Sequence, residues 1–157
     1  MQFGEFEEKG LIVRTKVNFR KIYDFLSRSE KDLQTSMANL KIDKEWSYTI
    51  AYHAMLRAGR ALMMSFGFRP KGKDQHRTIV KFTDRVFGAQ FKDLVREFDR
   101  MRRKRHEFIY EPTRPIAKQE AKHAVDKAAA LVKQILLFVE EKNPQKELIA
   151  DFNEGKG

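Results

Sequence analysis

One helix is almost completely visible in the sequence DKEWSYTIAYHAMLRAGRALMMSF, residues 43–66. Asp43 can accept hydrogen bonds from the first free amides of a helix, and Gly67 can adopt the left-handed conformation that ends one. Between them, apolar and small residues recur every three or four positions along one side: Trp46, Ile50, Ala51, Ala54, Met55, Ala58, Ala61 and Leu62. The four alanines allow a neighbouring backbone to approach closely, so we expect this helix to be central.

The segments on either side of residues 43–66 also have helical spacing. We expect helices over residues 18–42, with a polar turn near 27–31 where the helix could kink, and over 74–87, 90–110 and 115–142. Asp74 is the expected cap of the third helix, and Pro115 suits the first turn of the fifth. Residues 1–17 form an unassigned N-terminal tail, in which 11–13 could make a short strand, and 143–157 form a C-terminal tail that we expect to be frayed. The sequence therefore predicts an all-α protein, an up-and-down bundle of four or five helices over residues 18–142.

Size and charge narrow the class further. A chain of 157 residues fits one domain, and 32 Lys and Arg against 22 Asp and Glu give a net charge of +10. The electrostatic field of such a charge attracts polyanions. Nucleic acid is the leading expected partner, and an acidic protein or a membrane surface comes second. The chain has no Cys, which excludes a disulfide framework and a thiolate nucleophile, and no apolar run approaches the ~20 residues of a membrane span. We expect a soluble, cytoplasmic protein without a membrane partner.

The densest charge run is REFDRMRRKR, residues 96–105, which continues into His106. At ~100° per residue, Arg105 falls on the same stripe as Phe98, Met101 and Phe108, where an apolar residue is expected. A guanidinium at such a position must reach solvent, pair with a carboxylate or serve a site. The alternative is that the run is an ordinary solvated helix face.

A cluster suited to a phosphodiester can be drawn from this helix. Four side chains lie within about 60° of a common face: Arg102, Arg103, His106 and Tyr110. They combine fixed positive charge with an imidazole and a phenol. A second basic strip could extend a phosphate-contacting surface or be a solvated loop: Arg69, Lys71, Lys73, Arg77 and Lys81.

The remaining histidines have more ordinary interpretations. His53 lies among Ala and Met and suggests a hydrogen-bonded core or interface residue, and His76 suggests local capping at the start of the third helix. The four histidines show no metal-ligand spacing, and there is no phosphate-binding loop or Gly-rich dinucleotide turn. We expect neither a metal ion nor another cofactor.

Two stretches resemble a known family when they are taken together. These are AYHAMLRAGRALMMSFGFRPKGKDQH, residues 51–76, and DRMRRKRHEFIYEP, residues 99–112. In this order and separation they resemble the HEPN domains of bacteria and archaea, over roughly residues 18–142. The first is similar to the family's central helix and the loop and His that follow it. The second is similar to the family's polar motif, an Arg followed after four to six residues by a His.

The resemblance implies a helical bundle that forms a homodimer by apposing the motif helices of two subunits. In active members the shared cleft is a metal-independent endoribonuclease site. The His assists proton transfer as the ribose 2′-hydroxyl attacks the adjacent phosphate, and the Arg stabilises the developing charge. Many members are toxins paired with an antitoxin, often a minimal nucleotidyltransferase, and others are inactive RNA-binding or scaffolding versions.

The motif fits this chain in two registers. In the first, Arg100 is the motif Arg and His106 the motif His. In the second, Arg105 is the motif Arg, His106 takes the place of the polar residue after it, and Tyr110 stands where the His belongs. The position of Arg105 on the apolar stripe favours the second register. A phenol with a pKa near 10 transfers protons poorly at neutral pH, so cleavage would be weak or would need His106 as a substitute.

Two functions remain open from the sequence. One is an RNA-directed HEPN protein, either an endoribonuclease or a catalytically weakened RNA-binding version. Its site would be Arg105, His106 and Tyr110, and Arg102 and Arg103 would bind phosphates. The other is a non-catalytic interaction module that docks an acidic partner, such as a minimal nucleotidyltransferase antitoxin.

Overall fold

The computed structural model describes residues 2–111 and 115–144, apart from the side chains of Ile109 and Tyr110. The elements follow in the order α1 (Gly4–Glu8), β1 (Ile12–Arg14), α2 (Phe19–Asn39), α3 (Lys44–Ser65), β2 (Phe68–Pro70), α4 (Gln75–Phe87), α5 (Lys92–Tyr110) and α6 (Lys118–Lys142). The fold is the all-α bundle that the sequence predicts, with one small two-stranded sheet added.

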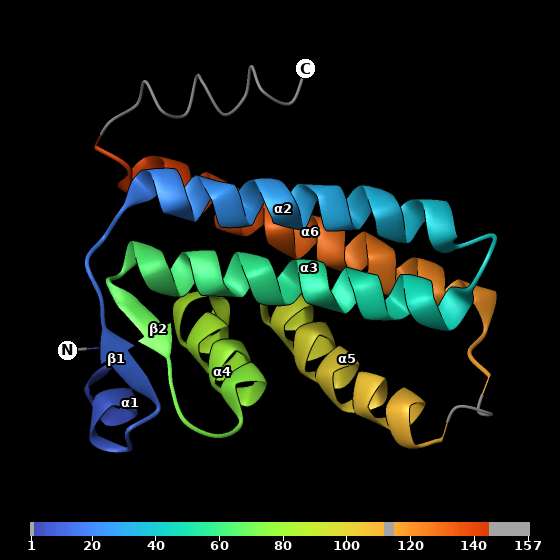
Figure 1. Ribbon diagram of the computed structural model, residues 1–157, viewed down its shortest axis with the longest axis horizontal. Coiled ribbons are helices and arrows are strands. Elements are labelled where there is room, and N and C mark those ends of the chain that lie inside the picture. Colours follow the sequence, from blue (N-terminus) through green and yellow to red (C-terminus); the bar gives the residue numbers. More distant parts are fainter. Residues whose placement is uncertain (1, 112–114, 145–157) are drawn as a thin grey trace.

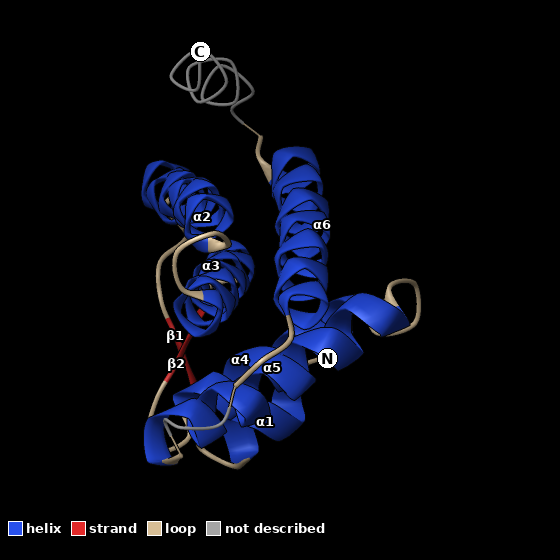
Figure 2. Cartoon of the chain, turned by 90° about the vertical axis from the view of Figure 1, so that its right-hand side faces the viewer, coloured by secondary structure: helices blue, strands red, loops and turns tan. Residues whose placement is uncertain are grey.

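Two layers of helices make up the bundle. Helices α2, α3 and α6 run side by side in one layer, and α4 and α5 pack obliquely against α3 from below (Figures 1 and 2). Helix α3 contacts α2, α4, α5 and α6, so the prediction that it is central is confirmed. It packs tightly on α4 at Gly59, where an added Cβ would lie 2.5 Å from Ile79 Cγ2.

The predicted start and end of α3 are confirmed. The Asp43 carboxylate accepts from the Trp46 amide at 3.0 Å, and Gly67 has a φ of +82°. The placement of Trp46 on the apolar side was wrong, because its side chain is 55% exposed. It belongs to the first turn of α3, which begins at Lys44.

Helix α2 is one continuous element, and two expectations about helix starts need correction. Helix α2 continues unbroken through residues 27–31, where Ser29 donates from within the core to the Ala54 carbonyl at 2.6 Å. Asp74 precedes α4 in a left-handed conformation, with φ 57°, and its side chain makes no capping hydrogen bond. Pro115 lies ahead of α6, which begins three residues later at Lys118.

The N-terminal segment, which the sequence leaves unassigned, is a strap across one end of the bundle. Strand β1 pairs antiparallel with β2, with Ile12 opposite Pro70. Phe3 is buried and stacks on Phe82 of α4, with ring centroids 4.2 Å apart. This packing fixes β2 and the loop after it against the body of the protein.

At the other end of the chain, Asn143 is buried and its amide nitrogen donates to the Tyr23 hydroxyl at 3.2 Å. The remainder of the expected C-terminal tail, residues 145–157, lies outside the described residues. Among the helices that the structure describes, none combines the length and the apolar composition needed to cross a bilayer.

Candidate nucleic-acid interface

A cleft of about 460 Å³ opens between the start of α4 and the second half of α5. It is lined by Asp74, His76, Arg77, Arg102, Arg103, Arg105, His106 and Glu107. Four arginines face two carboxylates here, so the cleft is positively charged. Helices α4 and α5 lie on the same side of α3, which brings residues that are far apart in the sequence to one place (Figure 1).

Arg105 occupies the inner side of α5, as its angular position predicts. Arg105 is half-buried and lies on the same stripe of α5 as Phe98 and Met101, which are fully buried. The Nε atom is buried and has no hydrogen-bond partner. No carboxylate of the described residues forms an ion pair with this guanidinium, and a charge without such a pair is costly to bury.

Beside Arg105, the buried hydroxyl of Tyr52 on α3 meets His76 on α4, with 3.0 Å between Tyr52 Oη and His76 Nδ1. Burial raises the pKa of the Tyr52 phenol, which is therefore protonated at neutral pH. Burial, followed by the charge of Arg105, lowers the pKa of His76 to about 4, so this imidazole is neutral. In the tautomer that carries its proton on Nε2, His76 accepts from Tyr52 and offers an N–H donor on its other side.

His53 completes the group on α3. Its ring lies 6.0 Å from that of Tyr52, and its pKa is lowered by burial and then by the charges of Arg105 and Arg57. The field of Arg105 thus reaches three ring systems from two other helices. A half-buried cation among neutral rings is suited to binding an anion.

Arg102 and Arg103 lie at the outer part of the cleft and share one carboxylate. Arg102 Nη2 is 3.0 Å from Asp99 Oδ1, and Arg103 Nε is 3.5 Å from Asp99 Oδ2. Asp99 partly offsets both charges but holds the Arg102 guanidinium in place. Arg105, by contrast, has no carboxylate partner in the part of the chain that the structure describes.

A family model describes the greater part of this structure. The model of the HEPN domain matches residues 22–142, from the first turn of α2 to the end of α6. The chain belongs to the HEPN domain family. No curated protein sequence matches it.

Within this HEPN domain, the structure brings together five of the residues that the sequence singled out: Arg77, Arg102, Arg103, Arg105 and His106. Lys71 and Lys73 do not line the cleft, although they lie in the loop that leads to it. Tyr110 is in the last turn of α5, but its side chain lies outside the described residues.

Arg100 faces a different neighbour. Its Nη2 lies 3.4 Å from Glu120 Oε2 on α6, and the adjacent turn of α5 adds Lys104, whose Nζ lies 2.8 Å from the same atom. Arg100 does not line the cleft that holds His106. The geometry therefore groups His106 with Arg105 rather than with Arg100.

Sequence reasoning missed Tyr52 and favoured a capping role for His76, although His76 ends the first stretch that resembles the family. The sequence did carry a signal for Tyr52, because it lies among the small residues of a helix expected to be central. A Tyr hydroxyl that is buried there needs a hydrogen-bond partner. The identity of the partner depends on how α3 crosses α4, and periodicity within one helix does not reveal that.

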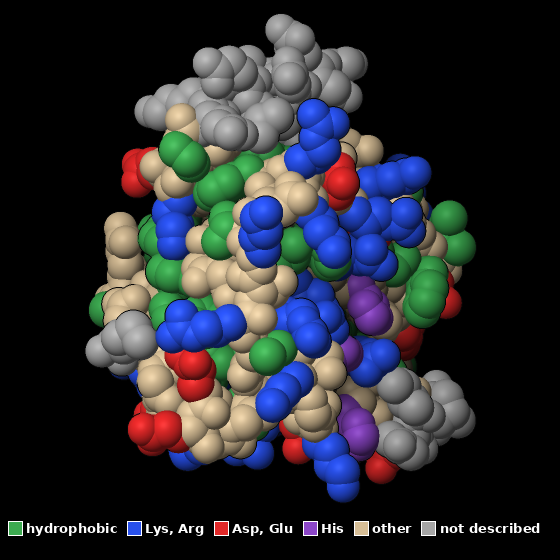
Figure 3. Space-filling view, turned by 60° about the vertical axis from the view of Figure 1, so that its left-hand side comes forward, with side chains coloured by type: hydrophobic (Ala, Val, Ile, Leu, Met, Phe, Trp, Pro, Cys, Tyr) green, Lys and Arg blue, Asp and Glu red, His purple; other side chains and the backbone are tan. Residues whose placement is uncertain are grey.

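The cleft is part of a larger basic face. Figure 3 shows Lys and Arg side chains gathered on one side of the HEPN domain, with His side chains among them. Among the described residues, no group of three or more His, Asp or Glu side chains is arranged to hold a metal ion.

Proposed function

We propose that this HEPN domain binds RNA and that a backbone phosphate enters the cleft between α4 and α5. One observation carries the proposal: the half-buried Arg105 guanidinium has an orphaned Nε and no carboxylate partner among the described residues. A half-buried cation without a counter-ion is unfavourable, whereas a phosphate supplies two oxygens that match the guanidinium fork.

Neighbouring groups suit the same ligand. His76 is neutral and offers an N–H donor in the tautomer described above, and Arg102 is preoriented by Asp99. These donors come from α4 and α5, so they can converge on one phosphate group from two sides. The net charge of +10 adds the long-range attraction that brings a polyanion to the surface.

A second candidate function is metal-independent cleavage of the bound RNA, and it is favoured by the presence of two imidazoles, His76 and His106, in one cleft. In this reaction the 2′-oxygen forms a bond to the adjacent phosphorus as its proton passes to a base. The bond from phosphorus to the 5′-oxygen breaks, and that oxygen receives a proton. The products are a 2′,3′-cyclic phosphate and a 5′-hydroxyl end, with Arg105 stabilising the charge on the phosphoryl oxygens.

Homodimerisation through α5 belongs to the same proposal. Arg103 and His106 are exposed on the outer side of α5, and a second copy apposed there would extend the cleft across two subunits. An acidic protein, including a minimal nucleotidyltransferase antitoxin, is the competing occupant of this surface.

The test is binding of fluorescently labelled single-stranded RNA in the presence of EDTA, measured by polarisation. We expect binding that weakens steeply with salt and is lost in Arg102→Glu/Arg105→Gln, while Lys133→Glu, an exposed change on α6, binds almost normally. If RNA binds the double variant as tightly as it binds the wild type, or if RNA does not bind at all, the proposal is overturned. The latter result together with capture of an acidic protein would favour the interaction module.

The same incubation, analysed on a denaturing gel, tests cleavage. Fragments with cyclic phosphate ends that disappear in His106→Ala support the nuclease. Intact RNA at full binding rejects cleavage and leaves the RNA-binding function standing.

A further inference from the structure

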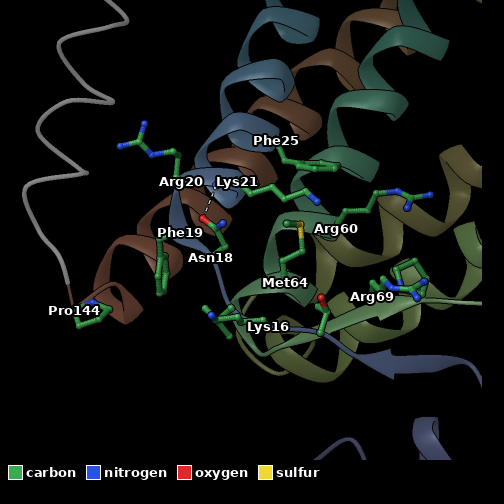
Figure 4. Close-up of a pocket in the computed structure, with 13 residues that line it drawn as sticks. Lys16, Asn18, Phe19, Arg20, Lys21, Phe25, Arg60, Met64, Arg69 and Pro144 are labelled. Atoms are coloured by element: carbon green, nitrogen blue, oxygen red, sulfur yellow. Dashed lines mark hydrogen bonds between the residues drawn. The ribbon is translucent and has the colours of Figure 1, made fainter.

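A second cavity, of about 840 Å³, is lined in part by Arg60 of α3. Its walls are the segment between β1 and α2, the first turns of α2, the C-terminal part of α3 and strand β2 (Figure 4). The N-terminal strap therefore builds one wall, because the pairing of β1 with β2 holds residues 15–18 beside Arg69.

The charged side chains that line this cavity are all basic. Five basic side chains line it: Lys16, Arg20, Lys21, Arg60 and Arg69. No Asp or Glu among the described residues lines it, and none forms an ion pair with any of these five. The outer arginines of the cleft, in contrast, share Asp99. Uncompensated cations around a hollow attract an anionic ligand.

Aromatic and thioether groups form the apolar part of the lining. Phe19 and Phe25 of α2 and Met64 of α3 are each half-buried, so part of each side chain remains accessible. Phe25 is four residues after Lys21 and lies on the same side of α2. In Figure 4 the Lys21 side chain lies between Phe25 and Met64. A ring beside a cation is the arrangement that binds an unstacked base together with its phosphate.

Arg60 connects the cavity to the cleft. It lines the cavity, and its charge is also one of the causes that lower the pKa of His76, which lines the cleft. In Figure 4 it lies between Lys21 and Arg69. Burial and the neighbouring charge of Arg57 lower the pKa of Arg60 itself, so a nearby anion would stabilise its charged form.

We propose that this cavity is a second RNA subsite, which takes a single-stranded nucleotide next to the one in the cleft. The strand passes over Arg60, its base stacks on Phe25, and its phosphates contact Lys21 and Arg69. Single-stranded RNA is the occupant because a paired base cannot turn its face to a side chain. The subsite rests on the proposed function, since it extends a strand whose first phosphate is at Arg105.

The experiment compares a dinucleotide with a single-stranded RNA of about ten nucleotides. In Lys21→Glu/Arg69→Glu we expect the longer RNA to bind roughly tenfold more weakly, with a salt slope reduced by about 1.4 for two lost phosphate contacts. The dinucleotide should bind this variant as it binds the wild type. Phe25→Leu, which keeps an apolar side chain, should weaken the longer RNA by about fivefold or more through lost stacking. Lys133→Glu is the charge control.

The outcomes separate this inference from the proposed function. Binding of the longer RNA could depend on Arg102 and Arg105 but not on Lys21, Arg69 and Phe25. That result overturns the subsite and leaves the proposed RNA binding in the cleft in place. If the wild type binds no RNA, both fall. Photocrosslinking of wild-type protein with a thiouridine-containing strand gives a check that needs no variant: crosslinks at Phe25 or Met64 support the subsite, and crosslinks confined to α5 reject it.

Discussion

The Tyr52 hydroxyl and His76 Nδ1 lie 3.0 Å apart, although 24 residues separate them in the chain. This bond joins α3 to α4 next to the guanidinium of Arg105, whose charge lowers the pKa of both His76 and His53. It ties the geometry of the cleft to the protonation of a half-buried imidazole. Stability and ligand binding at this site are therefore linked to pH.

Lowering the pH from 6.5 towards 4 should destabilise the folded protein through His76. Its pKa in the folded state is about 4 against an ordinary value of 6.5, so within this window the unfolded chain binds a proton that the folded chain excludes. The stabilising contribution is complete above the upper limit and is lost as pH falls through the window. Urea unfolding at a series of pH values should show a shallower dependence for His76→Gln than for the wild type. His53, whose pKa is also lowered, contributes with the same sign in both proteins. Parallel curves for the two proteins would refute the assignment to His76.

Arg105→Met should stabilise the protein while abolishing RNA binding. The substitution removes a half-buried charge with an orphaned Nε and places an apolar side chain on an apolar stripe, so we expect a gain of about 1 kcal/mol. The pKa of His76 should also rise, because the charge of Arg105 is the second cause of its lowering, after burial. Thermal unfolding and NMR titration measure the two effects. Arg103→Met is the matched control, and its stability should stay within about 0.5 kcal/mol of the wild type because the side chain is exposed. A loss of stability in Arg105→Met would show that the guanidinium has a structural partner.

Gly59→Ala should destabilise the crossing of α3 and α4. The new Cβ would lie 2.5 Å from Ile79 Cγ2, and this branched side chain is fully buried and cannot swing aside. Overpacking of this kind costs about 1–3 kcal/mol, which exceeds the gain in helix propensity. Urea unfolding measures the change. Gly4→Ala, where an added Cβ meets nothing within 4 Å, is the control. Equal stability of Gly59→Ala and the wild type would mean that the two helices can separate without cost.

The two aspartates ahead of α3 and α4 should respond differently to substitution. Asp43→Ala removes a side chain that accepts from the Trp46 amide, at a cost of about 1 kcal/mol. Asp74→Gly removes no capping bond and relieves a left-handed residue, so stability should be unchanged or slightly higher. Thermal unfolding of the two variants side by side checks this, and equal losses would contradict it.

Association of two copies through α5 should increase with salt or with added RNA. Each apposed surface carries the exposed Arg103, and the adjacent cleft adds Arg102 and Arg105. The mutual repulsion of these charges is screened over about 8 Å at physiological ionic strength. Sedimentation velocity should show a larger dimer fraction at high salt or with RNA present than at low salt. A monomer under all of these conditions would remove the dimer from the proposed function.

Much of this fold follows from the sequence alone. Helical spacing placed α2 to α6 within a few residues, because a repeat of 3.6 residues is a local property of each segment. The same angular count placed Arg105 on the buried side of α5 before any neighbour was known. Charge and composition pointed to a polyanion, since they require no knowledge of which residues meet.

Tertiary structure decided what those residues face. Arg100 pairs with Glu120 on α6, and Tyr52 meets His76. Strand β1 pairs with β2, which holds residues 15–18 in the lining of the second cavity. Each of these contacts depends on how two distant segments pack, and that is set by the fit of whole surfaces rather than by the period of either one.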